Sequence, residues 1–325
     1  VERSRGLGDV YKRQVLYPED STPQGKELRL QQQYFFVAAS IHDFLDNMLA
    51  DGFDLANLPE RVIFQLNDTH PVIAVPEFMR VLVDEKHLEW DAAWAITQQC
   101  FAYTCHTLLP EALEVWPVEL LGRLLPRHLE IIYRINDEFL VAVRERFGDD
   151  EMLVRNMSII AEHPERSVRM AYLATVAGAK VNGVAELHSQ LLRDKVLSDF
   201  DVFFPGKFTN VTNGVTPRRF LRLANPELSS LVTAAIGDGW TTDLERLHEL
   251  EPFAEDAEFR TAFAAVKAAN KRRLSEVLRE RDGVEISDGH MLDVMVKRLH
   301  EYKRQLLKVL HIVTTYEGVI SGRIA

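Results

Sequence analysis

Apolar residues recur with helical spacing through most of the first 200 positions. In residues 28–49 they form one broad face, made of Tyr34, Val37, Ala38, Ile41, Phe44, Leu45 and Met48. A face of this width is typical of an amphipathic helix that packs on a core. The same spacing predicts further helices over residues 76–83, 90–108, 111–121, 128–147, 166–177 and 184–200. Glycines follow the first and fifth of these helices, as is common after a helix end.

Short apolar runs between these helices predict buried strands. Residues 61–66 lie between Pro59 and a polar turn, and residues 179–181 are a shorter run of the same kind. A third run, residues 291–296, precedes a helical pattern that contains Leu306, Leu307, Leu310 and Val313. Strands that alternate with helices indicate an α/β fold with a parallel sheet.

Residues 203–217 break the helical pattern. They are rich in proline and glycine and have no helical period, so we place a domain boundary there. Beyond it, helices are expected over residues 219–223, 228–236, 243–250 and 258–281. Only one strand follows the boundary, although a parallel sheet needs several strand and helix units to bury both of its faces. We therefore expect the second domain to be incomplete.

Composition and charge exclude several classes of protein. The 325 residues carry a formal net charge of −11, which disfavours binding to nucleic acid or to a membrane surface. No apolar run approaches the ~18 residues of a transmembrane helix. The only two cysteines, Cys100 and Cys105, fall inside the helix predicted over residues 90–108 and point to different faces. Two free thiols without metal-binding spacing favour a reducing, cytoplasmic location.

A basic cluster stands out against this acidic background. Lys297, Arg298, Lys303 and Arg304 fall within eight positions, between the predicted strand and the helix after it. A cation at a helix N-terminus costs about 0.3–1 kcal/mol, whereas a phosphate there is favoured. The cluster therefore predicts a small-anion site. The alternative is a solvated basic face in which Glu301 pairs with a neighbouring cation.

Polar residues follow the strand predicted over residues 61–66. Asn67, Asp68 and His70 lie on the loop that leaves its C-terminal end, where α/β proteins bind ligands. A metal is not expected, because no third ligand and no helix-borne histidine pair is nearby. Amide, carboxylate and imidazole together suit the hydroxyl groups of a sugar. The alternative is that Asp68 caps the next helix.

Two further polar positions are ambiguous on their own. His106 ends an otherwise apolar helix pattern, and Asn213 lies in an Asn-Gly turn that favours positive φ. His188 lies among leucines and is interpreted as structural. No nucleophile elbow, P-loop or dinucleotide-binding glycine motif is present. Spacing alone thus indicates an anion and polyol site of unspecified chemistry.

Taken in order, eight segments resemble one family, the glycogen, starch and maltodextrin phosphorylases. They are residues 25–30, 65–71, 76–84, 103–117, 124–129, 181–184, 212–219 and 296–305. The resemblance implies a two-domain α/β architecture of the glycosyltransferase-B type, truncated at both ends. Residues 15–211 would be the latter part of the first domain and residues 212–325 the opening part of the cofactor-binding domain. Residues 1–14 do not match and are expected to be an unrelated lead-in.

Members of this family use inorganic phosphate to release glucose 1-phosphate from the non-reducing end of an α-1,4-glucan. Their pyridoxal 5′-phosphate acts through its own phosphate group. By resemblance, Lys297 contacts that cofactor phosphate, Arg298 and Lys303 hold the substrate phosphate, and Tyr302 lies beside the glucosyl unit. Cations between the two phosphates would offset their repulsion.

The same resemblance assigns residues to the sugar. His106 and Asn213 would bind the glucosyl 6-hydroxyl end, and Asp68 and His70 would line the pocket beside the ring. Phe220 stands where the family usually has tryptophan near the cofactor. Residues 19–21 are Glu-Asp-Ser where animal enzymes have Asn-Asp-Asn, which leaves the behaviour of that gate loop open. The full-length protein is expected to form a homodimer.

The segment with the family's Schiff-base lysine is absent, so the chain alone is expected to be inactive. The first alternative to a phosphorylase is a non-catalytic scaffold that binds carbohydrate or anions. The second is a glycosyltransferase that uses a sugar nucleotide. The preferred glucan is not specified by these residues.

Overall fold

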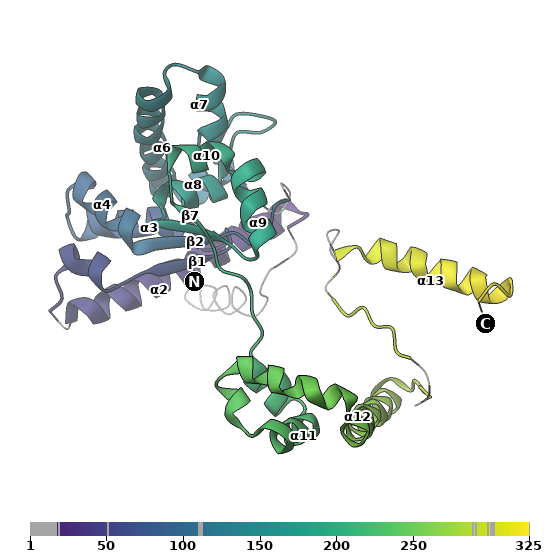
Figure 1. Cartoon of the computed structure of the whole chain (residues 1–325). Coiled ribbons are helices and arrows are strands. Elements are labelled where there is room, and N and C mark those ends of the chain that lie inside the picture. The colour runs from purple at the N-terminus through teal and green to yellow at the C-terminus, as the bar shows by residue number, and fades with distance from the viewer. Residues whose placement is uncertain are drawn as a thin grey trace, which may run out of the picture. The chain divides into compact units, whose positions relative to one another are not determined.

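The computed structural model describes residues 18, 20–50, 52–109, 113–287, 289, 291–297, 299 and 303–324. The chain divides into two compact units between Gly214 and Val215 (Figure 1). Each unit is described by itself. Among the described residues, no helix is both long and apolar enough to span a membrane.

A four-stranded parallel sheet forms the centre of the first unit. Its strands are β1 (Phe64–Asn67), β2 (Phe101–Thr104), β6 (Lys180–Gly183) and β7 (Phe208–Asn210), in the spatial order β1-β2-β6-β7. Each connection moves to the next strand in the same direction. Since crossover connections are right-handed, the connecting helices lie on the same face of the sheet. The carboxyl ends of all four strands meet at one edge.

Helices join these strands and precede the first of them (Figure 1). The elements between β1 and β2 are α3 (Ala74–Arg80), η2 (Val81–Glu85) and α4 (Trp90–Cys100). Those between β6 and β7 are α9 (Glu186–Leu191), η4 (Leu192–Val196) and α10 (Ser198–Phe203). The long helix α2 (Pro23–Ala50) and the 3₁₀ turn η1 (Leu55–Glu60) come before β1.

The connection from β2 to β6 contains a second, smaller sheet. Strands β3 (Val115–Pro117), β4 (Ile160–Ala161) and β5 (Ser167–Arg169) are antiparallel, in the order β3-β5-β4. Four helices accompany them, which are α5 (Val118–Leu124), α6 (Pro126–Phe147), α7 (Glu151–Met157) and α8 (Met170–Ala177).

The two faces of the parallel sheet differ in polarity because side chains alternate along each strand. Phe101 and Tyr103 of β2 are fully buried, and the Phe101 ring lies 5.5 Å from that of Phe78 on α3. Residues on the opposite face include Gln65, Asn67, Thr104 and Asn182, and none of these is buried. The core therefore lies on the helix side, and a row of polar side chains lies on the other.

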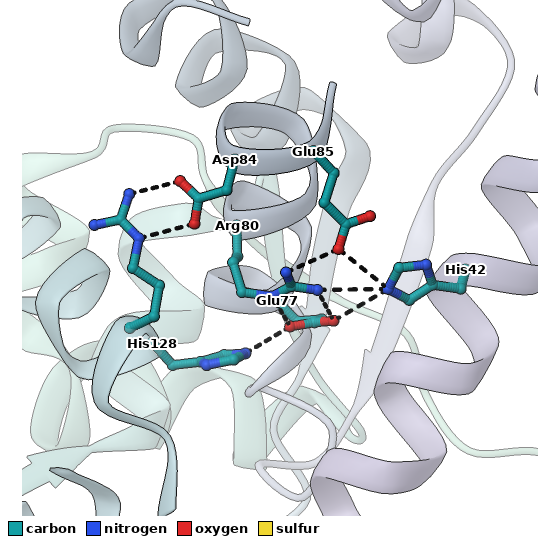
Figure 2. A network of polar contacts seen from close by, with 7 residues as sticks. His42, Glu77, Arg80, Asp84, Glu85 and His128 are labelled. Atoms are coloured by element: carbon teal, nitrogen blue, oxygen red, sulfur yellow. Dashed lines mark hydrogen bonds and ion pairs between the residues drawn. The ribbon is translucent and has the colours of Figure 1, made fainter. Parts of the chain in front are cut away.

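A buried ion-pair network joins α3 to α2 and α6 (Figure 2). The Glu77 carboxylate is fully buried and accepts two hydrogen bonds from Arg80, both 2.9 Å long. His128 Nε2 lies 2.6 Å from the same carboxylate. His42 Nε2 approaches it to 3.6 Å, and Arg80 Nη1 also contacts Glu85 at 2.8 Å. Three helices are thus joined through one carboxylate.

The network holds Glu77 ionised. Burial disfavours its charge, but the hydrogen bonds from Arg80 and His128 outweigh that cost and lower the pKa of Glu77 to about 2. Next to it, Arg127 donates two hydrogen bonds of 2.7 and 2.8 Å to Asp84, which lower the pKa of that carboxyl group.

The second unit is helical in its described residues. It contains η5 (Arg218–Leu223), α11 (Pro226–Ile236), η6 (Gly239–Thr241), η7 (Leu244–Glu255), α12 (Ala257–Asp282) and α13 (Gln305–Ile320). Its small core is formed by Val232, Ile236 and the fully buried Trp240.

Several predicted elements are confirmed and others are wrong. The helices expected over residues 28–49, 128–147 and 258–281 are present as α2, α6 and α12. The helix expected over residues 90–108 ends at Cys100, because the next four residues pair with β1 and β6. Cys105 therefore lies beyond a strand and not inside a helix, although both thiols are free and buried as expected.

The remaining corrections concern short segments. Within residues 111–121, the described part is strand β3 followed by the start of α5, and the first residues of the helix expected at 166–177 form β5. Strand β7 had not been predicted. Residues 291–296 are not a strand, because no neighbouring strand lies in the described part of the second unit. Met291 is 90% exposed there, although the helix after the basic cluster is confirmed as α13.

Candidate functional site

The carboxyl edge of the parallel sheet brings three of the predicted site residues together in the first unit. Asp68 directly follows β1, and its amide donates to the carbonyl of Thr104 at 3.0 Å. His106 follows β2 two residues after the strand ends. Asn213 lies beyond β7, and its amide donates to the carbonyl of Val184 at 2.9 Å. Backbone hydrogen bonds thus tie the loops after β1, β2, β6 and β7 to one another.

Gly183, the last residue of β6, allows helix α9 to pack closely against the end of that strand. A Cβ atom at this position would lie 2.3 Å from the hydroxyl and 2.8 Å from the Cα of Ser189 on α9. The Ser189 hydroxyl in turn donates to Asn210 Oδ1 at 2.7 Å. The start of α9 therefore lies against the end of β6, next to the segment that carries Asn213.

Asp68 does not cap the following helix, so that alternative is wrong. Helix α3 begins at Ala74, and its N-cap residue is Ile73, which makes no side-chain cap. Asp68 instead has φ of 69° in the left-handed region, and its Oδ1 accepts from the amide of Thr69 at 2.8 Å. Its carboxylate is half-buried in the loop at the sheet edge.

His70 is held by a carboxylate from the loop before β3. Its Nδ1 lies 3.2 Å from Glu114 Oε2, and Gln33 donates to the same oxygen at 2.9 Å. The hydrogen bond to Glu114 raises the pKa of His70, against the opposing effect of burial. His70 also lines a pocket of about 280 Å³. The other lining residues are Arg29, Gln32, Gln33, Phe36, Val37, Asn67 and Pro71.

His106 is exposed and is oriented by Asn67. Its Nε2 is hydrogen-bonded to Asn67 Oδ1. Burial, and to a lesser extent the charge of the neighbouring His106, lower the pKa of His188. His188 had been interpreted as structural from its leucine neighbours, and its Nδ1 does accept from the Val184 amide at 3.3 Å. Its proximity to His106 could not be inferred from sequence spacing.

The described part of the chain contains no group of three potential metal ligands. The side chains at the carboxyl edge are amides, a carboxylate and imidazoles. Together they supply both hydrogen-bond donors and acceptors for the hydroxyl groups of a polyol. A Glu114 partner for His70 and an Asn67 partner for His106 had not been predicted. Both partners lie far from their histidines in the sequence, at 44 and 39 residues.

The remaining predicted residues belong to the second unit. Lys297 is exposed, and its carbonyl accepts a 3.3 Å hydrogen bond from the side chain of Gln305, the first residue of α13. Lys303 is half-buried, two residues before that helix. Phe220 lies on η5 and is 63% exposed. Arg298 and Tyr302 lie outside the described residues. Lysine ammonium groups beside a helix N-terminus suit a phosphate.

Comparison with known proteins gives consistent matches over nearly the whole chain. A family model described as carbohydrate phosphorylase matches residues 11–324. The glycogen phosphorylase of Haemophilus influenzae is 49% identical over 308 residues, which cover 95% of this chain and 38% of that protein. The glycogen phosphorylase of Synechocystis is 53% identical over 302 residues, covering 93% and 36%. The human liver form is 47% identical over 313 residues, covering 94% and 37%. The chain thus spans a little over a third of the length of these relatives.

Proposed function

Because this chain belongs to the carbohydrate phosphorylase family, we propose that it contributes part of the active site of an α-1,4-glucan phosphorylase. The reaction is phosphorolysis, in which inorganic phosphate replaces the glucan at C1 of the terminal glucosyl unit. The products are glucose 1-phosphate and a glucan shorter by one unit. The enzyme is accordingly a hexosyltransferase.

The observation that carries this proposal is the convergence of Asp68, His106 and Asn213 at one sheet edge. Backbone hydrogen bonds join the segments that hold them, as in the bond from the Asp68 amide to Thr104 at the end of β2. We assign His106 and Asn213 to the 6-hydroxyl end of the glucosyl unit, and Asp68 and His70 to the pocket beside the ring. The hydrogen bond with Glu114 raises the pKa of His70 and so favours the protonated ring, which can donate a hydrogen bond to the sugar.

We assign the anion sites to the basic cluster of the second unit. Lys297 would hold the phosphate of pyridoxal 5′-phosphate, and Lys303 the substrate phosphate, with Arg298 beside it and Tyr302 beside the sugar. Phe220 would lie against the cofactor ring. The donor chemistry suits an anion, since two lysines lie in the segment that leads into α13, and a hydrogen bond from Gln305 joins the backbone of Lys297 to the start of that helix. When bound, the cofactor would supply a phosphate group that exchanges a proton with the substrate phosphate.

A chimaera tests this proposal. Residues 15–324 of the chain replace the matching segment of the Haemophilus influenzae glycogen phosphorylase, to which the chain is 49% identical. We expect the chimaera to release glucose 1-phosphate from maltodextrin and phosphate. A chimaera that is folded, as judged by cooperative melting and cofactor absorbance, but does not catalyse this reaction would overturn the proposal. Binding of carbohydrate without turnover would favour the scaffold, and turnover of a sugar nucleotide would favour the glycosyltransferase.

A further inference from the structure

We propose that Asn67 is a positioning residue that fixes the tautomer and the ring orientation of His106. The inference rests on the proposed function only in the identity of the ligand, a sugar hydroxyl. The two residues leave neighbouring strands at the same sheet edge, since Asn67 ends β1 and pairs in register with Thr104, the last residue of β2. His106 lies two positions farther along.

The direction of the hydrogen bond follows from the chemistry of its two atoms. Asn67 Oδ1 bears no hydrogen and can only accept, so His106 Nε2 must donate. In the neutral ring, Nδ1 then has a free lone pair and lies on the side of the imidazole away from Nε2. That nitrogen can accept a hydrogen bond from a hydroxyl group. Asn67 therefore determines which ring nitrogen is the acceptor.

A row of polar side chains holds the end of β1 in place. Gln65 Nε2 donates to the hydroxyl of Thr104 at 2.8 Å, and that hydroxyl donates to Asn182 Oδ1 at 2.8 Å. Because a threonine hydroxyl has only one hydrogen, these two bonds fix the direction of the whole row. The Asn182 amide nitrogen then donates to the carbonyl of Gly183 at 3.0 Å. The row spans β1, β2 and β6 just behind Asn67.

The neighbouring His188 provides an internal reference. Its Nδ1 accepts from the amide of Val184, so its hydrogen must be on Nε2 when the ring is neutral. This tautomer is set by the backbone and does not involve Asn67. A change in Asn67 should therefore alter the tautomer of His106 and leave that of His188 unchanged.

Nitrogen NMR of the imidazole rings in this chain tests the proposal. The spectra are recorded at a pH where both histidines are neutral. The nitrogen chemical shifts then show which ring nitrogen carries the hydrogen and so distinguish the two tautomers. We compare the wild type with Asn67→Ala and with Asn67→Asp, which retains an acceptor oxygen at the same position. Asn67→Ala should lower the ratio of Nε2–H to Nδ1–H at His106 about tenfold, or ~1.4 kcal/mol, whereas Asn67→Asp should keep the wild-type preference.

Two results would overturn the positioning role. One is an unchanged His106 tautomer ratio in Asn67→Ala, and the other is a loss of the preference in both variants. Titration of the chimaera with glucose 1-phosphate forms a separate arm, in which the Nδ1 signal of His106 should shift. Absence of that shift, with the tautomer effects intact, would reject the sugar hydroxyl as the ligand and would count against the proposed function alone.

Discussion

Glu77 provides the most quantitative prediction. Replacement by glutamine removes the charge from a fully buried carboxylate that accepts two hydrogen bonds from Arg80 and contacts His128. The new amide nitrogen cannot accept these bonds, and the Arg80 guanidinium loses its main buried counter-charge. The substitution should therefore loosen the junction of α2, α3 and α6.

The magnitude follows from the pKa of Glu77, which is lowered from 4.5 to about 2. At 1.36 kcal/mol per pKa unit, this lowering corresponds to about 3 kcal/mol of stability at pH 7. Loss of one partner from a buried ion pair typically costs about 3–5 kcal/mol, which agrees. We expect Glu77→Gln to lower the free energy of unfolding of the first unit by about 3 kcal/mol.

The pH dependence gives a second check on the same residue. Because the pKa is lower in the folded state, the contribution is present above the unfolded value of 4.5 and is lost as the pH falls towards 2. The stability difference between wild type and Glu77→Gln should therefore be constant from pH 7 to pH 6. It should fall to less than half of that value at pH 3.

Hydrogen exchange of peptides from α3 and α6, measured at increasing urea concentration, gives the free energy of unfolding of the first unit separately from that of the second. Glu130→Gln is the matched control, because Glu130 is 67% exposed and its pair with Arg127 should contribute less than about 1 kcal/mol. Equal losses in the two variants would refute the assignment of a strong network to Glu77. A Glu77→Gln difference that does not shrink in acid would refute the charge-based explanation.

Three further predictions concern other parts of the first unit. Glu114→Gln should lower the pKa of His70, because it replaces the charged acceptor that stabilises the protonated ring by a neutral one; an unchanged NMR titration would contradict this. Gly183→Ala should destabilise the unit by about 1–3 kcal/mol, because the new methyl group meets the backbone of α9. Gly214→Ala, where the methyl group meets nothing, is its control in thermal unfolding, and equal melting temperatures would reject the close-packing explanation. Burial raises the pKa of Cys100 from 9.0 to about 11, which lowers the fraction of thiolate at pH 8 about 100-fold. Cys100 should therefore react with iodoacetamide about 100-fold more slowly in the folded protein than in urea, and equal rates by mass spectrometry would contradict this.

Long periodic helices were the part of the fold best predicted from the sequence. Helix α6 was expected over residues 128–147 and is found at Pro126–Phe147. Apolar residues repeated with helical spacing over that length are not compatible with a strand. The error at β2 arose where Cys100 and Tyr103 continue the helical spacing of α4. Only pairing with β1 and β6 makes this segment a strand, and pairing partners are not visible in local spacing.

The candidate site was predictable in its residue types and only partly in its geometry. Asp68 was identified because it follows a predicted buried strand, whereas His106 was ambiguous by spacing and was assigned only through the family resemblance. In the structure both follow strands of the parallel sheet. The partners Asn67 and Glu114 require knowledge of which strands are adjacent. The Glu77 network did leave a signal in the sequence, since a carboxylate within the apolar stretch of α3 has to find a buried counter-charge.

We propose above that His106 and Asn213 recognise the 6-hydroxyl end of a glucosyl unit. The most direct measurement compares glucose 1-phosphate with its 6-deoxy analogue as glucosyl donors in glucan synthesis by the chimaera. The assignment of these two residues predicts that the unsubstituted chimaera prefers glucose 1-phosphate in kcat/KM by about 10²-fold or more, because a site built to hydrogen-bond a substrate hydroxyl rejects an analogue that lacks it. It also predicts that His106→Ala loses most of that preference, mainly through a lower kcat/KM for glucose 1-phosphate. An undiminished preference in a folded His106→Ala chimaera would contradict the assignment of His106 to the 6-hydroxyl.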